Sequence, residues 1–327
     1  MFHRQAALAA AVASLVASLG ASSAAVASCG SAFCMVNTNW GVQGVWNEPG
    51  FRGDLRFEYI DQDQPRTGTR DVAVGEIPHH HDEVRTINRN LFATLDYGIS
   101  EAIGVSLILP WVDRAHEHIH NHQGEPELES WNFSGLGDMR VAGRYQFPPT
   151  TTDPQATRVG FAGLTGGLKL PTGRTTVANG EGEIAERTLQ PGTGTTDALL
   201  GAYYREALGS INASWFAQAN LQLPVDSYHA FRPGKQVLVD VGGRWDATAK
   251  LGLMLQLNAL YKGRDSGAEA EPDDSGSRSV SLSPGFTYAL TPSVQIYAFV
   301  QIPVYQYVNG VQLIADRSYA VGVSAQF

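Results

Sequence analysis

The sequence has few cysteines, few charges and, beyond its first residues, no long apolar run. Its 327 residues include only two cysteines, Cys29 and Cys34, which excludes a scaffold built on several disulfides. Charged residues make up 17% of the chain, the net charge is −9 and no basic stripe is present, so we expect no nucleic-acid partner. After residue 27 no segment is long and apolar enough to cross a membrane as a helix, so any insertion must use strands.

The first 27 residues have the composition of a signal peptide. Arg4 is their only charge, the stretch 6–27 is rich in Ala, Leu, Val and Ser, and it ends in the cleavage pattern Ala25-Val26-Ala27. Removing this peptide takes away Arg4 and changes the net charge from −9 to −10. We therefore expect a signal peptide over 1–27, a periplasmic N-terminal segment over 28–51 and a folded body over 52–327. An uncleaved anchor is less expected, because no basic stop-transfer cluster follows.

The strongest pattern in the remaining chain is a period of two. One face of residues 251–261 is apolar and the other is polar or small, with Leu251, Leu253, Leu255 and Leu257 alternating with Gly252, Met254, Gln256 and Asn258. Such alternation predicts β-strands with one apolar face. We find it in twelve segments, which are residues 54–61, 89–97, 102–110, 136–147, 158–170, 196–206, 210–223, 236–247, 250–261, 279–290, 293–304 and 316–327.

The lengths of these segments and of their connections favour a membrane barrel. Soluble strands usually have about five or six residues, whereas a tilted membrane strand needs about nine to eleven. The connections alternate between tight turns, such as 98–101 and 248–249, and long links over 62–88, 111–135, 171–194, 224–235, 262–278 and 305–315. This predicts an all-β fold, an antiparallel transmembrane β-barrel of about 12 strands in the outer membrane, with short periplasmic turns and long external loops. A secreted β-sandwich is the alternative.

Two kinds of partner follow from this fold. The lipid of the outer membrane would contact the apolar faces of the strands. The chain ends in Phe327, on the same face as Tyr319, Val321 and Val323, and a terminal aromatic there resembles the signal read by the barrel assembly machinery.

The polar faces of the strands would form the lumen of the barrel. They carry acids and arginines, namely Asp54, Arg56, Glu58, Asp96, Asp138, Arg140, Arg144, Asp197, Arg205, Asp240, Arg244 and Asp246. Twelve strands give a bore between the filled interior of about eight strands and the open channel of about sixteen. Charges of both signs can pair across such a bore and narrow it, or they can simply solvate a wet interior.

Apart from His3, all histidines fall in segments predicted as external loops. Seven of them occupy the first two loops, and these are His79, His80, His81, His116, His118, His120 and His122. Imidazole suits Zn²⁺, Cu²⁺ and Ni²⁺, so these histidines are candidate ligands for a divalent transition metal. The alternative is a hydrophilic surface without a specific site. We expect no other cofactor.

The two cysteines lie directly after the cleavage site, in an oxidising compartment. We expect a small disulfide loop between Cys29 and Cys34. The stretch Val26-Ala27-Ser28-Cys29 also resembles a lipobox, which would instead place a lipid on Cys29.

Three glycine-rich motifs carry a family resemblance over residues 135–327. They are Gly135-Leu136-Gly137-Asp138, Leu168-Lys169-Leu170-Pro171-Thr172-Gly173 and Leu189-Gln190-Pro191-Gly192-Thr193-Gly194-Thr195-Thr196-Asp197. Together they resemble the outer-membrane proteins grouped as the meta-pathway of phenol degradation family. The resemblance implies a transporter-like barrel channel that takes up small organic molecules, including aromatic ones, and it supplies no catalytic residues.

The functional expectation is therefore a channel for small solutes with histidine-rich external loops. A non-conducting surface anchor that sequesters metal is the alternative. A hydrolase is less expected, because the chain has no G-x-S-x-G motif and no mature histidine on a predicted strand.

Overall fold

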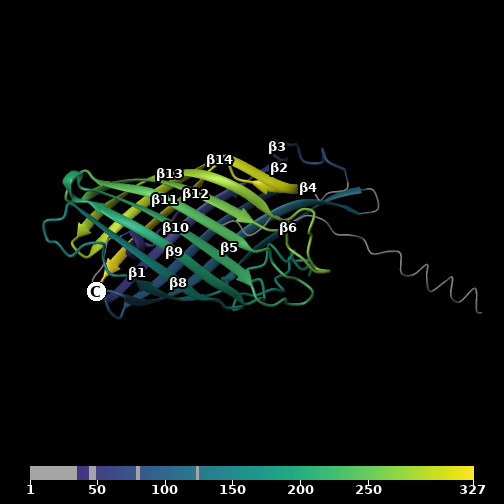
Figure 1. Cartoon of the computed structure of the whole chain (residues 1–327). Helices are drawn as coiled ribbons and strands as arrows, with labels where there is room; N and C mark the ends of the chain where they lie inside the picture. The colour runs from purple at the N-terminus through teal and green to yellow at the C-terminus, as the bar shows by residue number, and fades with distance from the viewer. Residues whose placement is uncertain (1–34, 44–48, 79–81, 123–124) are drawn as a thin grey trace, which may run out of the picture.

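Twelve antiparallel strands close into a barrel in a computed structural model that describes residues 35–43, 49–78, 82–122 and 125–327 (Figure 1). The barrel strands are β1 (Gly50–Gln62), β4 (Asp82–Gly98), β5 (Ile103–His122), β7 (Arg140–Gln146), β8 (Arg158–Lys169), β9 (Asp197–Leu208), β10 (Ala213–Pro224), β11 (Gln236–Asp246), β12 (Leu251–Lys262), β13 (Ser277–Thr291), β14 (Val294–Ile314) and β15 (Ser318–Gln326). Outside the described residues lie the predicted signal peptide and Cys29, Cys34, His79, His80 and His81.

The barrel is closed by pairing between its first and last strands. Each strand pairs with its neighbours in the sequence, and β1 pairs antiparallel with both β4 and β15. No strand edge is therefore left open along the wall, as a membrane environment requires. The predicted fold class and the number of strands are confirmed.

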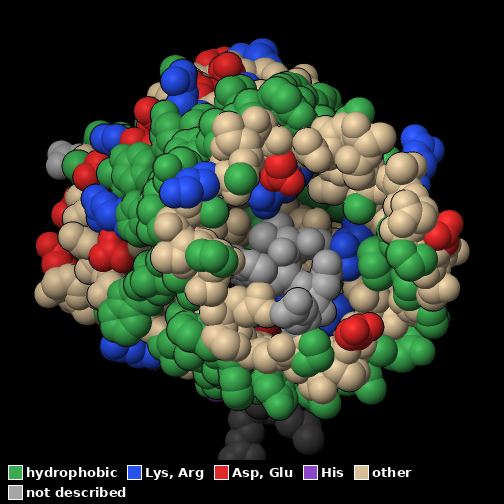
Figure 2. All heavy atoms as spheres, turned by 90° about the vertical axis from the view of Figure 1, so that its left-hand side faces the viewer, with side chains coloured by type: hydrophobic (Ala, Val, Ile, Leu, Met, Phe, Trp, Pro, Cys, Tyr) green, Lys and Arg blue, Asp and Glu red, His purple; other side chains and the backbone are tan. Residues whose placement is uncertain are grey.

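The alternation of side chains explains which surface faces lipid. On β12 the side chain of Leu255 is 51% exposed on the outer surface, whereas its neighbour Gln256 is 1% exposed on the inner surface. The same alternation places Val239 and Val241 of β11 and Val321 and Val323 of β15 outside. Figure 2 looks onto the end of the barrel that carries the short turns, and hydrophobic side chains lie around its periphery. A barrel buries its polar faces and turns its apolar faces outward only where the surroundings are apolar.

The opposite end, which we call the long-loop end, is extended by further strands. The strand β6 (Glu125–Leu136) pairs with β5, β2 (Gln64–Gly68) pairs with β14, and β3 (Arg70–Asp71) pairs with β2. The links 111–135 and 305–315, predicted as loops, are thus largely strand. On β5 the outward positions beyond Trp111 include Asp113 and Glu117, so the apolar alternation is interrupted although backbone pairing continues. A prediction based on apolar residues therefore placed the ends of these strands too early in the sequence.

In the part of the chain that the structure describes, helical structure is confined to two short turns, α2 (Trp40–Gln43) and the 3₁₀ helix η1 (Gly209–Ile211). Within the described residues, no helix is long and apolar enough to cross a membrane.

Candidate functional site in the barrel lumen

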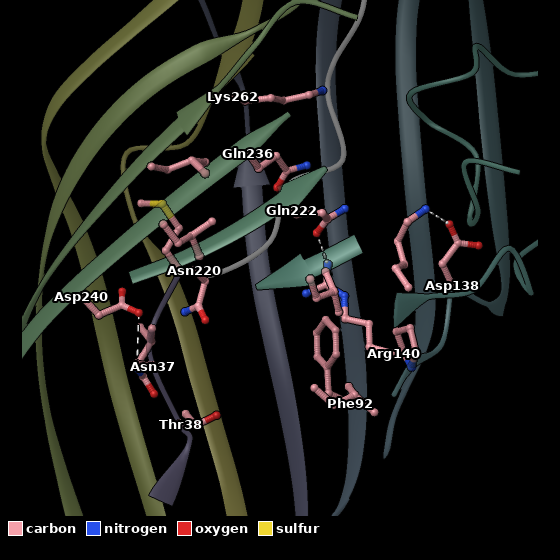
Figure 3. A pocket seen from close by; sticks show the side chains of 18 of the residues that line it. Asn37, Thr38, Phe92, Asp138, Arg140, Asn220, Gln222, Gln236, Asp240 and Lys262 are labelled. Atoms are coloured by element: carbon pink, nitrogen blue, oxygen red, sulfur yellow. Dashed lines mark hydrogen bonds and ion pairs between the residues drawn. The ribbon is translucent and has the colours of Figure 1, made fainter. Parts of the chain in front are cut away.

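The barrel encloses a cavity of about 560 Å³. Its walls come from the inner faces of the barrel strands, from residues 35–41 and from the connection between β8 and β9. Figure 3 shows part of this lining, with Asn37 beside Asp240 on one side of the pocket and Asp138 and Arg140 on the other. The lumen therefore holds a space into which a small solute can fit.

An N-terminal segment, residues 35–43, lies inside the barrel. The backbone N–H of Asn37 donates to Gln256 Oε1 at 2.9 Å, and Gln256 Nε2 donates to the Asn37 carbonyl at 2.9 Å. The side-chain amide of Asn37 also donates to Asp240 Oδ2 at 3.3 Å. These partners lie on β11 and β12, so the segment is held against one side of the lumen by polar groups.

The same segment reaches the other side of the lumen through an aromatic residue. Trp40 Nε1 donates to Asp54 Oδ2 at 3.2 Å, and the Tyr297 hydroxyl donates to Asp54 Oδ1 at 2.9 Å. The rings of Trp40 and Tyr297 meet edge to face with centroids 4.8 Å apart. The segment thus crosses the bore between β11–β12 and β1–β14 and narrows it. This placement was not predicted from the sequence, because nothing in the period-two pattern concerns residues 35–43.

The predicted lumen charges fall into three groups. Seven line the cavity, namely Asp54, Arg56, Asp96, Asp138, Arg140, Arg144 and Asp240. Three are buried in the inner wall beside other groups: Glu58 beside Arg56, Asp197 beside Lys169 and Arg205 over the ring of Phe161. The last two, Arg244 and Asp246, form a 2.7 Å pair next to a short turn, away from the cavity.

Basic side chains outnumber acidic ones along the cavity. Nine basic residues line it, which are Arg52, Arg56, Arg140, Arg144, Lys169, Arg187, Lys262, Arg278 and Arg317. Five acidic residues line it, which are Asp54, Asp96, Asp138, Asp240 and Asp265. Arg52 and Lys262 were missed from the sequence because they lie just outside the predicted segments 54–61 and 250–261. The lumen thus has the opposite charge balance to the chain as a whole.

Lys169 joins the three glycine-rich motifs. Its ammonium lies 2.8 Å from Asp138 Oδ2 and 3.4 Å from Asp197 Oδ1, and it donates to the Thr195 carbonyl at 2.9 Å. Asp138 Oδ1 in turn accepts the backbone N–H of Gly173 at 3.1 Å. One buried network therefore ties the start of β7, the end of β8 and the start of β9.

This network holds the connection between β8 and β9, residues 170–196, which we call the inward loop. Arg114, on the inner face of β5, donates to the carbonyl of Leu189, a residue fully buried in the loop. Trp131 Nε1 of β6 donates to the Glu183 carbonyl at 3.0 Å. Five residues of this connection line the cavity, namely Arg187, Thr188, Gln190, Pro191 and Thr193. The inward loop therefore forms part of the lumen wall at the long-loop end.

Two charged groups of the inward loop have shifted pKa values. The pKa of the Glu186 carboxyl is raised well above its usual range, first by burial and then by repulsion from Glu83 and Asp274. Burial lowers the pKa of Arg187, whose guanidinium packs over the ring of Phe231. Placing the inward loop in the lumen therefore costs free energy, because both groups lose water.

The histidines predicted to lie in the second external loop instead lie on a strand. His116, His118, His120 and His122 all belong to β5. The expectation that no mature histidine lies on a strand is therefore wrong, for the reason given above for residues 111–135. His116 and His118 are buried on the inner face, and His118 Nε2 lies 3.0 Å from Glu129 Oε2 of β6. His229 has a positive φ of 45° in the connection between β10 and β11.

The closed barrel, its apolar outer surface and its polar lumen define an outer-membrane β-barrel protein. The COG4313 outer membrane channel from Pseudomonas putida F1 is 12% identical, with 86% of this chain and 97% of that chain covered and a TM-score of 0.63. The CymD monoaromatic hydrocarbon channel is 11% identical, with 88% and 92% covered and a TM-score of 0.41. At 12% identity, the likeness to the Pseudomonas putida channel shows similarity of fold only. No curated protein matches the chain.

Residues 84–311 match the family model described as "Putative MetA-pathway of phenol degradation". The match spans well over half of the chain and includes all three motifs of the Lys169 network. The protein belongs to this family.

Proposed function

We propose that the protein is an outer-membrane channel for small organic solutes. The observation that carries the proposal is the 560 Å³ cavity, which lies inside a closed barrel and is lined by charged and amide side chains. An anchor needs only an apolar outer surface and a filled interior, whereas a passage needs lining groups that can replace water around a solute.

The lining chemistry favours organic anions that carry an aromatic ring. Nine basic and five acidic side chains line the cavity, so it attracts an anion more strongly than a cation. The rings of Phe92, Tyr307 and Phe231 also face the cavity and offer apolar contact. The family description refers to phenol degradation, which supports aromatic solutes, and the similar protein from Pseudomonas putida is a channel, which supports passage through the barrel. The preference for acids rests on the basic lining of the cavity alone.

The test is conduction by the refolded mature protein. In planar bilayers we expect small single-channel steps, because residues 35–43 narrow the bore. In a liposome-swelling assay we expect benzoate to enter faster than a neutral sugar of similar size. A barrel that admits neither ions nor benzoate, while its gel migration shows that it is folded, would favour the anchor.

We also propose that the histidines of β5 bind a divalent transition metal. The specific observation is that ligand atoms of His118, His120 and Glu129 lie within 4.8 Å of one another. Titration of Zn²⁺ into the untagged protein tests this independently of conduction.

A third proposal concerns assembly. Phe327 is 81% exposed, and its backbone N–H donates to the Phe51 carbonyl at 2.9 Å, so the terminal ring projects from the wall of the barrel. We expect Phe327→Ala to lower the amount of protein in the outer membrane while the same purified variant still refolds in detergent. Unchanged outer-membrane yield would remove this role for the ring.

A further inference from the structure

The hairpin of β5 and β6 brings two histidines and a glutamate together on its inner face. His118 and His120 are two residues apart on β5, so their side chains project from the same face of the strand. Glu129 of β6 is the direct cross-strand partner of His118. The candidate ligand atoms of the three residues all lie within 4.8 Å of one another.

We propose that His118, His120 and Glu129 form a binding site for one divalent transition metal ion, Zn²⁺ or Cu²⁺. The inference rests on the metal-binding function proposed above for the histidines and names its ligands, while it is independent of whether the barrel conducts. Two imidazoles and a carboxylate match zinc sites that keep a fourth position open, and nitrogen-rich sites also suit Cu²⁺.

The contacts around His118 are compatible with the tautomer that a metal ligand needs. His118 Nδ1 lies 3.3 Å from His116 Nε2, and His116 Nδ1 lies 2.8 Å from the hydroxyl of Thr86. If each Nδ1 carries the hydrogen, His118 donates to His116 and His116 donates to Thr86. This chain leaves Nε2 of His118 as the lone-pair donor facing Glu129. Ligating histidines typically donate their other N–H in this way, which orients the ring and strengthens the ligand.

The two histidines of the site differ in exposure. His118 is 3% exposed, and its ring packs against Trp131 with centroids 4.7 Å apart. His120 is only half-buried, and its cross-strand partner Glu127 is exposed. A metal ion can therefore enter from the side of His120, and the open coordination position faces Glu127 or water.

The spacing requires only a small closure around the ion. Zinc binds imidazole nitrogen at about 2.0–2.1 Å, so tetrahedral ligand atoms stand about 3.3 Å apart. The pair His118 Nε2 and Glu129 Oε2 is already 3.0 Å apart. The remaining closure falls on His120, the more exposed of the two histidines. His116 does not contribute a ligand in this arrangement and acts as a positioning residue.

The test is metal titration of the untagged mature protein in detergent. Zn²⁺ is followed by competition with a chromogenic chelator, and Cu²⁺ by its electron paramagnetic resonance spectrum. We expect one tight equivalent in the wild type, and loss of that equivalent in His118→Ala and in Glu129→Gln. The matched control is Glu117→Gln, which removes a carboxylate from the outer face of the same strand and leaves affinity unchanged. His229→Ala is a second control.

His116→Ala separates positioning from ligation. We expect the stoichiometry to stay at one, the affinity to fall by about 10- to 100-fold, and the nitrogen hyperfine pattern of bound Cu²⁺ to persist. Equal binding by wild type, His118→Ala and Glu129→Gln would overturn the site and leave only nonspecific binding by exposed histidines. Single-channel recordings of His118→Ala keep the two proposals apart, since normal conductance with lost metal binding affects the metal site alone.

Discussion

The Lys169 ammonium lies 2.8 Å from the Asp138 carboxylate, and this contact joins residues 31 positions apart in the sequence. Both side chains are almost completely buried, and Asp197 adds a second carboxylate at 3.4 Å. The glycine-rich motifs that identify the family are therefore one structural unit. Gly173 and Gly192 pass so close to each other that a Cβ on either would meet backbone atoms of the other at less than 3 Å. This unit holds the inward loop in the lumen.

Replacing Lys169 with methionine should release the inward loop. The change leaves Asp138 and Asp197 buried without their cation, and breaking a buried pair typically costs about 3–5 kcal/mol. We expect faster trypsin cleavage at Arg174 and Arg187 and a lower midpoint of urea unfolding in detergent. Arg158→Met is the control, because Arg158 is largely exposed and lies 3.8 Å from Glu206. Such an exposed pair contributes at most about 1 kcal/mol. Equal stability of the two variants would contradict this role for Lys169.

The barrel could be predicted from the sequence because the alternating pattern that marks its strands is local. Each outward position must be apolar and each inward position polar, so a period of two marks the strands wherever lipid covers them. The alternating pattern is lost where the strands extend beyond the lipid. His116 and His118 continue β5, but their outward neighbour Glu117 is polar, so the strand extension and its inward-facing histidines were predicted as a loop.

The interior of the lumen was less predictable, because its contacts are not local. Two partners of Asn37, Gln256 and Asp240, lie more than 200 residues away in the sequence. The alternation indicated that Gln256 and Asp240 face inward, but no pattern indicates which segment they meet. For the same reason, the sequence could place the charged residues on the inner face. Their pairing, such as that of Arg244 with Asp246 near a turn, could be seen only in the structure.

Weakening the contacts of the N-terminal segment should widen the channel. Asn37→Ala combined with Trp40→Ala removes the hydrogen bonds to Asp240 and Asp54 and the ring contact with Tyr297. We expect a larger single-channel conductance and more frequent long openings in planar bilayers. The control is Asn39→Ser, which changes an exposed residue and keeps an oxygen for the N–H of Val42 at the start of α2. Identical conductance of the double variant and the wild type would show that the segment does not obstruct the bore.

Removing one lumen cation should reduce the preference for anions. Arg140 lines the cavity and donates to Gln222 Oε1 at 3.3 Å, so Arg140→Gln keeps a hydrogen-bonding side chain while it removes the charge. Reversal potentials in a KCl gradient measure the ratio of anion to cation permeability, and we expect this ratio to fall. Arg89→Gln is the control, because Arg89 is exposed and pairs with Asp113 at 3.0 Å outside the cavity. A ratio that falls equally in both variants would mean that the lumen charges do not select the ion.

The half-buried Glu186 should make the inward loop sensitive to pH. Its pKa is raised, first by burial and then by Glu83 and Asp274, so the folded loop binds the Glu186 proton more tightly than the unfolded chain does. The neutral form therefore stabilises the seated loop. This contribution is fully present below the ordinary pKa of glutamate and is lost as pH rises through the higher pKa of the folded state.

Limited proteolysis across a range of pH measures this effect. We expect cleavage of the wild-type inward loop at Arg187 to speed up as pH rises, relative to a small peptide substrate that corrects for the protease's own pH dependence. Glu186→Gln imitates the neutral carboxyl, so its cleavage rate should stay low and almost independent of pH. The control is Glu181→Gln, an exposed residue of the same loop, which should follow the wild type. If Glu186→Gln shows the same rise with pH as the wild type, ionisation of Glu186 does not unseat the loop, and the pH response has to come from another group around it.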